Sequence, residues 1–257
     1  MASTREKLSR KTKEQIAARE AQVAAFVAKL DRFLDANLQQ ILGEIETGDV
    51  KGVEAANVLG GIMRELKAKG LRAEVGKLEA IYGSELRAVR EALDDASAAD
   101  VLTDVDYQLT ETLITFDVQK VENRIVTHVD DLRSTIMRSV IVGETPDIRQ
   151  LREDFGSGIA ANIETEVRTG VQGFNRTLTL AKAEEADLDL FIYLGPDDKI
   201  TRPFCDARVG KIFTRKEIAQ WDNGQGLPAD IYLGGYNCRH QLRPVSPEMA
   251  KGLGYNG

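Results

Sequence analysis

The sequence of 257 residues is poor in the features that define several common protein classes. It contains only two cysteines, Cys205 and Cys238, which are too few for a disulfide framework and suit a reducing compartment. No apolar run approaches the roughly 20 residues that a membrane-spanning helix requires, so we expect no membrane partner. The opening segment MASTREKLSRKTKE has no apolar stretch behind its charges, and we therefore do not expect a signal peptide.

Proline and tryptophan are also scarce, and their positions divide the chain. Five of the six prolines, the single tryptophan and both cysteines follow Asp187, whereas the preceding part contains only Pro146. Because proline interrupts helices, the first part favours long helices and the second favours short elements and turns. We therefore predict a mainly α protein. Residues 1–186 form an extended, coiled-coil-like helical region with long helices, and residues 187–257 form a small α+β module.

Apolar residues recur at steps of three and four through most of the first part, which is the pattern of a buried helical face. The pattern predicts helices over about residues 23–45, 53–66, 71–93, 105–140, 148–155 and 159–174. We expect the first of these to end at Thr47-Gly48-Asp49, and Gly156-Ser157-Gly158 to separate the last two. The helix over 105–140 would measure roughly 60 Å, which favours a coiled-coil-like hairpin or an extended bundle.

The second part shows short β-like runs in place of helical periodicity. Strands are predicted over Phe191–Leu194, Lys211–Phe213 and Tyr236–Val245, separated by glycine- and proline-rich turns. Thr214-Arg215-Lys216-Glu217 has the form of a capping box, so a short helix is expected to begin there.

Charge is distributed unevenly along the chain. The net charge of −7 argues against a general nucleic-acid coat, yet residues 1–19 carry six Lys or Arg against two Asp or Glu. Such a basic arm could contact DNA or an acidic protein surface, and a solvated terminus is the alternative interpretation. The residues of the possible DNA arm are Arg5, Lys7, Arg10, Lys11 and Lys13.

The residues best suited to chemistry are Cys205, Cys238 and His240. In an extended strand, residues two apart face the same side, so Cys238 and His240 would point together and could meet Cys205. Two thiolates and an imidazole form a possible zinc site, whose fourth ligand would be a water or a carboxylate such as Asp206 or Asp222. The alternatives are two small buried hydrophobic cysteines with His240 bonded to a carbonyl, or a disulfide.

A cysteine nucleophile is a further alternative, because Cys205 and His240 could act as nucleophile and base. No acid that would orient the histidine can be singled out, so we assign no catalytic residue and do not expect an enzyme. Arg202 and Arg239 could form a contact surface for phosphate or carboxylate groups. Structural ion pairs with Asp197, Asp198 or Asp206 are the competing interpretation of these two arginines.

Four segments of the second part come in a distinctive order: Tyr193–Asp198, Thr201–Cys205, Gly210–Thr214 and Gly234–His240. This order resembles the C-terminal pattern of the phage Mu F-like family of minor head (head morphogenesis) proteins. That pattern has an aspartate, then Thr-Arg, then a Cys or His, then a glycine, and finally Asn-Cys-Arg followed by His or Cys. The resemblance is specific at Asn237–His240 and covers about residues 158–245. Cys205 stands where many relatives have histidine.

The helix before this module also fits the resemblance. Arg168, Gly173, Asn175 and Arg176 lie where the family carries an arginine-bearing helix. The N-terminal helices match the family only in kind. The resemblance implies a virion protein of a tailed phage or prophage, present in several copies at the capsid interior or portal vertex, and in the host cytoplasm during assembly. It implies the portal protein, the major capsid protein and possibly phage DNA as partners, in head assembly and DNA packaging or ejection.

Two other functional hypotheses remain open at this point. One is a small nuclease-, transferase- or toxin-like enzyme centred on Cys205 and His240, and the other is a coiled-coil scaffold without a virion role. If the chain is a head protein, we expect the long helix over 105–140 to dock on a partner through an apolar stripe that includes Leu113 and Ile125.

Overall fold

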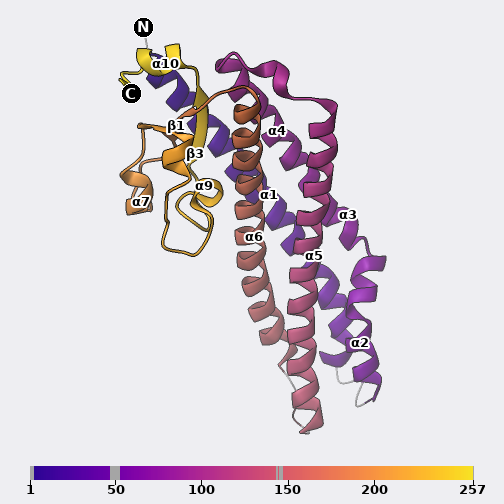
Figure 1. The fold of residues 1–257 in the computed structure, drawn as a ribbon. Coiled ribbons are helices and arrows are strands. Elements are labelled where there is room, and N and C mark those ends of the chain that lie inside the picture. Colours follow the sequence, from indigo (N-terminus) through magenta and orange to yellow (C-terminus); the bar gives the residue numbers. More distant parts are fainter. Residues whose placement is uncertain (1–2, 47–52, 143, 145–146, 257) are drawn as a thin grey trace. The chain divides into compact units, whose positions relative to one another are not determined.

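The computed structural model describes residues 3–46, 53–142, 144 and 147–256. The chain is mainly helical (72%), with a long N-terminal helix and a small three-stranded antiparallel sheet toward the C-terminus (Figure 1). This confirms the predicted fold class. In the described part of the chain, no helix combines the length and the apolarity that crossing a membrane requires.

Three helices are long: α1 (Thr4–Glu46), α5 (Asp104–Ile141) and α6 (Ile148–Glu185). Between α1 and α5 lie α2 (Val53–Ala68), α3 (Leu71–Gly76), α4 (Leu78–Asp95) and the 3-10 helix η1 (Ala99–Val101). After α6 come β1 (Leu190–Leu194), α7 (Pro203–Asp206), β2 (Ile212–Thr214), α8 (Arg215–Ile218), α9 (Ala229–Tyr232), β3 (Gln241–Val245) and α10 (Pro247–Gly252). The helix end expected at Thr47-Gly48-Asp49 lies outside the described residues.

Contacts divide the chain into two units. Unit 1 comprises Met1–Gln22, Ala80–Leu113 and Arg168–Gly257, and unit 2 comprises Val23–Glu79 and Ile114–Val167. The boundary expected between residues 186 and 187 marks the change from helix to strand. The units divide the chain differently, because unit 1 joins the C-terminal module to segments of α1, α4, α5 and α6.

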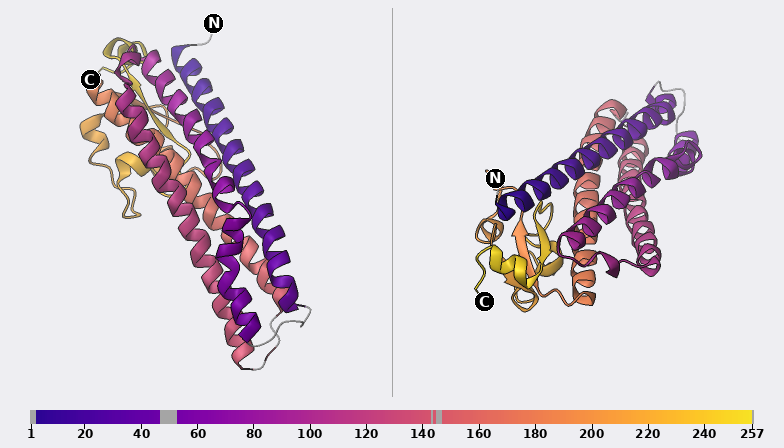
Figure 2. Two further views of the ribbon diagram at one scale, coloured as in Figure 1. Left: turned by 90° about the vertical axis from the view of Figure 1, so that its right-hand side faces the viewer. Right: turned by 90° about the horizontal axis from the view of Figure 1, so that it is seen from above.

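Unit 2 is built from the apolar faces of helical segments that lie side by side (Figure 2). Leu30, Leu34 and Leu38 of α1 are buried at the helical spacing that the sequence predicts. Polar contacts join α5 and α6 at the rim of this packing, where Arg124 Nη2 lies 3.1 Å from Glu166 Oε2. The further buried residues of the unit 2 helices include Leu59, Ile62, Leu66, Val121, Ile125, Val129, Leu132, Ile136, Ile159 and Ile163.

Several helix boundaries differ from the predictions. Helix α1 begins at Thr4, well before the predicted start at residue 23, and α6 runs to Glu185, beyond the predicted end at residue 174. The helix expected over 71–93 is divided into α3 and α4 at Lys77, whose N–H bonds to the carbonyl of Glu74 just after the poor helix former Gly76. Conversely, the two helices expected over 148–174 form one continuous helix, α6. Each glycine costs a helix about 1 kcal/mol, whereas burying a large apolar side chain contributes about 1.5–3 kcal/mol. The helix therefore continues past Gly156 and Gly158, because burial of residues such as Phe155 and Ile159 outweighs the cost of the glycines.

The sheet of unit 1 has the order β2-β1-β3, and both pairings are antiparallel. Alternate residues of β1 face opposite sides, so Phe191 and Tyr193 enter one apolar cluster while Ile192 and Leu194 enter another. Leu8 of α1 belongs to the second cluster, which means that the start of the chain packs against its C-terminal sheet. The predicted capping box is confirmed, because Thr214 and Glu217 bond reciprocally at the start of α8.

Candidate metal centre

The side chains of Cys205, Cys238 and His240 gather in unit 1, as the sequence predicted. The two Sγ atoms lie 3.7 Å apart, and Cys238 Sγ lies 3.8 Å from His240 Nδ1. All three residues are buried, and their ligand atoms lie within 4.8 Å of one another. These separations define a single group that could hold a metal ion such as zinc.

The local backbone that creates this group differs from the expected strand. β3 begins only at Gln241, so Cys238 and His240 precede it. Gly235 (φ +91°) and Asn237 (φ +57°) adopt left-handed conformations, which an extended strand does not contain. The expectation of a strand from Tyr236 was therefore wrong, although the two side chains do point toward one group.

Arg202 fixes the turn that carries Cys238. Its Nη1 donates to the carbonyl of Gly234 at 3.0 Å and its Nη2 donates to the carbonyl of Tyr236 at 2.8 Å. Arg202 is also the N-cap residue of the short helix α7, which carries Cys205. Arg202 thus links the two segments that supply the sulfur atoms. Its guanidinium is engaged by backbone carbonyls of the same unit.

Gly234 and Gly195 lack a side chain where one would collide with the Cys205, Cys238 and His240 group. A Cβ atom at Gly234 would lie 2.5 Å from Cys205 Sγ and 3.4 Å from Cys238 Sγ, and a Cβ at Gly195 would overlap the imidazole ring of His240. The N–H of Gly234 also lies 3.4 Å from Cys238 Sγ as a hydrogen-bond donor. A donor aimed at sulfur favours the thiolate, which is the form that binds metals.

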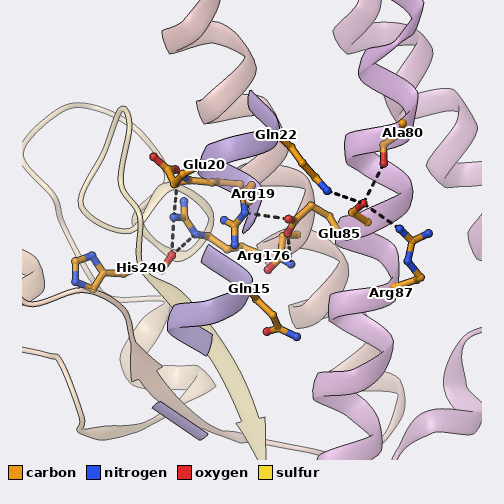
Figure 3. A network of polar contacts seen from close by, with 12 residues as sticks. Gln15, Arg19, Glu20, Gln22, Ala80, Glu85, Arg87, Arg176 and His240 are labelled. Atoms are coloured by element: carbon orange, nitrogen blue, oxygen red, sulfur yellow. Dashed lines mark hydrogen bonds and ion pairs between the residues drawn. The ribbon is translucent and has the colours of Figure 1, made fainter. Parts of the chain in front are cut away.

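Arg176 of α6 lies behind the two ligand residues of the turn. Its Nη2 donates to the carbonyl oxygens of Cys238 at 2.5 Å and His240 at 2.7 Å, and its Nη1 donates to the carbonyl of Ile231 at 3.1 Å. Figure 3 shows the guanidinium directed at the His240 carbonyl. Arg176 is only 1% exposed, so these bonds are shielded from bulk solvent.

Burial and mutual contact set the protonation of the two thiols. The hydrogen bond with Cys238 and burial raise the pKa of Cys205, whereas the same hydrogen bond, together with Arg176 and His240, lowers the pKa of Cys238. The two sulfurs titrate as a pair, and the surroundings of Cys238 are those that favour the thiolate. A raised pKa works against Cys205 as a nucleophile. Burial also raises the pKa of Tyr193, which stacks on His240 at a ring distance of 5.2 Å.

The spacing of the group fits a tetrahedral zinc ion. Zn–S bonds of about 2.3 Å at tetrahedral angles place two sulfurs roughly 3.8 Å apart, close to the separation seen here. Nδ1 is the ring nitrogen that faces Cys238, and the buried Nε2 has no hydrogen-bond partner among the described atoms. The alternative in which the His240 ring bonds a carbonyl is therefore not what the structure contains.

The fourth ligand position does not receive either of the carboxylates that the sequence suggested. Asp206 and Asp222 are exposed, and within the described ranges the metal-competent group consists of three side chains. A cavity of about 160 Å³ adjoins the group and is lined in part by Thr201, Asn237 and Arg239. Cys205, Cys238 and His240 also line this cavity, so a fourth ligand would lie on this side of the group.

The other predicted contact residues are engaged within unit 1. Arg239 Nη2 donates to Asp198 Oδ1 at 2.6 Å, and this bond lowers the pKa of Asp198 to about 2. Arg202 is bonded to backbone carbonyls, as described above. The structure therefore gives Arg239 the ion pair that was the competing interpretation, and a wider contact surface stays a prediction.

The basic N-terminal segment is part of helix α1. Arg5 Nη2 donates to the carbonyl of Leu253 at 2.5 Å, Lys11 Nζ lies 3.0 Å from Asp95 Oδ2, and Arg10 Nε lies 3.8 Å from Glu14 Oε1. The two remaining residues of the arm, Lys7 and Lys13, are exposed. A DNA-binding role for the five residues stays a prediction.

A buried polar network in unit 1 was missed at the level of sequence. Arg19 Nε donates to Glu85 Oε1 at 2.9 Å (Figure 3). Asn175 Nδ2 donates to Glu85 Oε2 at 2.8 Å. Lys182 Nζ lies 2.5 Å from Asp106 Oδ1 in a second buried pair. The available signal was that Arg19 continues the apolar face of α1, three residues after Ile16, where a charged residue is unexpected.

Comparison with known proteins gave no match among protein-family models, curated proteins or solved structures. The assignment of function therefore depends on the residues and geometry described above.

Proposed function

We propose that this chain is a structural minor head protein of a tailed phage or prophage, which works by assembly. One observation carries the proposal: the separate segments that resemble the Mu F-like pattern interlock in unit 1. Cys205 meets Cys238 and His240, Arg202 holds the turn that carries Cys238, and Arg176 bonds the carbonyls of both turn ligands. A pattern whose members depend on one another in this way supports a shared module more strongly than residue order alone.

Zinc is the metal that we propose for the module, held by Cys205, Cys238 and His240. Two thiolates and one imidazole suit zinc better than the oxygen-seeking cations. The ion would act as a cross-link between α7 and the turn before β3, in a region whose strands have only three to five residues. The enclosure of all three ligands favours this structural role.

Helix α5 supplies the proposed docking surface for the portal protein or a neighbouring capsid protein. Leu113 and Phe116 lie one turn apart on this helix and are 44% and 55% exposed, and Ile141 at its end is 76% exposed. Exposed apolar side chains at helical spacing are suited to a protein partner. Ile125 is fully buried in unit 2, so the stripe expected over the whole helix is narrower, and the side chains of Val105, Leu109 and Val140 lie outside the described set.

The docking proposal is tested by copurification with the portal protein and by incorporation into heads. Leu113→Asp and Phe116→Asp place a charge on the exposed apolar surface, and each should weaken portal binding by roughly ten-fold or more if the residue is buried at the interface. Thr115→Asp is the matched control, because Thr115 is an exposed residue of the same helix that lies about 160° around its axis from Leu113 and about 100° from Phe116. Circular dichroism should show unchanged helicity in all three variants. Normal incorporation of both Leu113 and Phe116 variants would reject docking through α5.

The metal is tested separately from assembly. Elemental analysis of the purified chain should give about one zinc per chain, and Cys205→Ser or Cys238→Ser should abolish retention of the ion. Asp206→Asn changes an exposed neighbour of Cys205 and should leave the zinc content unchanged. A metal-free wild-type chain that stays folded would reject the zinc centre and leave the head-protein proposal to the incorporation assay.

A further inference from the structure

Unit 1 contains three arginines whose side chains are almost completely buried: Arg19, Arg176 and Arg243. Arg19 is paired with Glu85, and Arg243 is paired with Asp95. Arg176 makes no ion pair with a carboxylate among the described residues. A buried charge without a counter-charge is costly, so other groups must stabilise the guanidinium of Arg176.

The guanidinium of Arg176 is surrounded by oxygen acceptors from the metal-binding turn. Nε and Nη2 both donate to the carbonyl of His240, at 3.1 and 2.7 Å, and Nη2 also donates to the carbonyl of Cys238. The Oε1 atom of Gln172, one helical turn earlier on α6, accepts from Nη2 at 3.0 Å. The planar fork of an arginine is suited to holding two backbone carbonyls in a fixed relation, which the single ammonium of a lysine cannot do.

Those two carbonyls belong to the two ligand residues of the Cys-x-His segment. Fixing them on the side of α6 fixes the backbone from Cys238 to His240, and with it the directions of both side chains. The segment needs such support because it lies outside β3 and follows Asn237, which has a left-handed backbone. Nη1 extends the same support to the carbonyl of Ile231, shortly before Gly234.

The donors of Arg176 are occupied by these neutral acceptors, so the arrangement of the carbonyls accounts for the position of the guanidinium behind the turn.

We propose that Arg176 is the positioning residue of the metal centre: it holds the carbonyls of Cys238 and His240 so that both side chains face one ion. This inference rests on the zinc centre proposed above. It assigns Arg176 an action on the metal through the ligand residues, without direct contact with the ion.

The test compares two equally buried arginines in the full-length chain. Zinc dissociation constants are measured by competition with a chromophoric chelator for the wild type, Arg176→Lys, Arg176→Met and Arg19→Lys. Loss of outer-shell support typically weakens metal binding by about 10- to 100-fold, so Arg176→Met should fall in this range. Arg176→Lys should recover part of the loss, because its ammonium keeps a hydrogen-bond donor for one of the two carbonyls. Arg19→Lys should bind zinc like the wild type, because Arg19 contacts Glu85 and not the ligand residues.

Substitution of zinc by cobalt reports on sulfur coordination directly, through an absorption band that does not depend on the overall stability of a folded variant. The thiolate-to-cobalt absorption should keep its wild-type intensity in Arg19→Lys and should decrease in Arg176→Met, where one or both sulfurs bind poorly. Arg176→Lys retains charge and length, so it tests the proposal even if the methionine variant does not fold. Wild-type affinity and absorption in Arg176→Lys and any folded Arg176→Met would overturn the inference while leaving the zinc centre intact. A wild-type chain that binds no zinc would reject both.

Discussion

The two units differ in what they bury. In the described part of the chain, every buried polar or charged residue belongs to unit 1, and the buried side chains of unit 2 are apolar. Apolar packing is adaptable, because similar shapes can substitute for one another, whereas a buried charge requires a particular partner at a particular place. The buried polar residues of unit 1 are Thr12, Arg19, Glu85, Asp106, Thr110, Gln172, Asn175, Arg176, Thr179, Lys182, His240, Gln241 and Arg243.

This difference indicates a division of roles. Unit 1 joins chain segments that are far apart in sequence, and its polar contacts identify the correct partners for α1, α4, α6 and the C-terminal module. Unit 2 joins helical segments through one continuous apolar face each, and its stability follows from the amount of buried surface. Changes of charge should therefore damage unit 1 most, and changes of helix propensity or apolar shape should show their effects in unit 2.

The largest expected effect is the loss of the central carboxylate in unit 1. Glu85→Ala removes the acceptor of both Arg19 and Asn175 and leaves a buried guanidinium without a counter-charge. Breaking a buried pair in this way costs about 3–5 kcal/mol of unfolding free energy. Urea denaturation followed by circular dichroism measures the change.

The double variant Arg19→Met with Glu85→Leu is the control for this prediction. It removes both charges and fills the space with apolar groups, which is often close to neutral for a buried ion pair. We therefore expect it to recover the part of the lost stability that comes from the uncompensated charge of Arg19, whereas the hydrogen bond of Asn175 to Glu85 is lost in both variants. A double variant as unstable as the single one would show that the charges are not what makes unit 1 sensitive.

A second buried pair should give a smaller effect with a defined pH dependence. Burial alone would raise the pKa of Asp106, but hydrogen bonds from Lys182 and Thr103 lower it below its usual value of 3.8. A lowered pKa stabilises the fold above the unfolded value, and this contribution is lost as pH falls through the folded value. Asp106→Asn should cost about 1.5–3 kcal/mol near neutral pH, because Lys182 keeps its bond to Glu185.

The same variant provides the measurement that tests the assignment. The difference in unfolding free energy between wild type and Asp106→Asn should shrink as the pH falls through the folded-state pKa of Asp106, which lies below the usual value of 3.8, because the wild-type carboxylate then becomes protonated. A difference that is independent of pH would mean that the carboxylate charge does not contribute. Asp130→Asn, which changes an exposed pair of unit 2 with Arg133, should have an effect below about 1 kcal/mol.

The contrast between the units also explains what the sequence could and could not predict. The periodicity of residues such as Leu30, Leu34 and Leu38 predicted the helices of unit 2, because a buried helical face leaves a repeated pattern in one segment. The partners of Arg19 and Lys182 were not predictable, since Glu85 and Asp106 lie far away in sequence and a lone charge carries no information about its partner. Long-range pairing requires the fold itself.

The metal centre lies between these two cases. The types and spacing of Cys238 and His240 predicted a shared site with Cys205, and the three residues do converge. The local conformation was not predictable. In place of the expected strand, Asn237 has a left-handed backbone and Arg202 donates a hydrogen bond to the carbonyl of Gly234. The role of Gly234 as the space for both sulfurs also depends on tertiary contacts that no local pattern contains.

A matched pair of substitutions to methionine sharpens the comparison further. Leu34 in unit 2 and Gln172 in unit 1 are both about 1% exposed, and methionine is close in size to each. Leu34→Met conserves apolar volume and should cost less than about 1.5 kcal/mol. Gln172→Met removes the acceptor that Arg176 uses and should cost about 1–3 kcal/mol, measured by the same urea titration. Equal effects would contradict the distinction between the units.

The smallest expected effect has the opposite sign. Gly158 lies inside helix α6, in its unit 2 segment, and a Cβ atom added there would meet nothing within 4 Å. Alanine restricts the unfolded chain more than glycine does and favours helix, so Gly158→Ala should stabilise the protein by about 0.5–1 kcal/mol. The same change at Gly234 in unit 1 brings a Cβ to 2.5 Å from Cys205 Sγ and should displace the sulfur and weaken zinc retention. Thermal unfolding of the first variant and elemental analysis of the second measure the two outcomes. If Gly158→Ala were destabilising, the helix would depend on a close contact at this position, and the view of unit 2 as adaptable packing would be wrong.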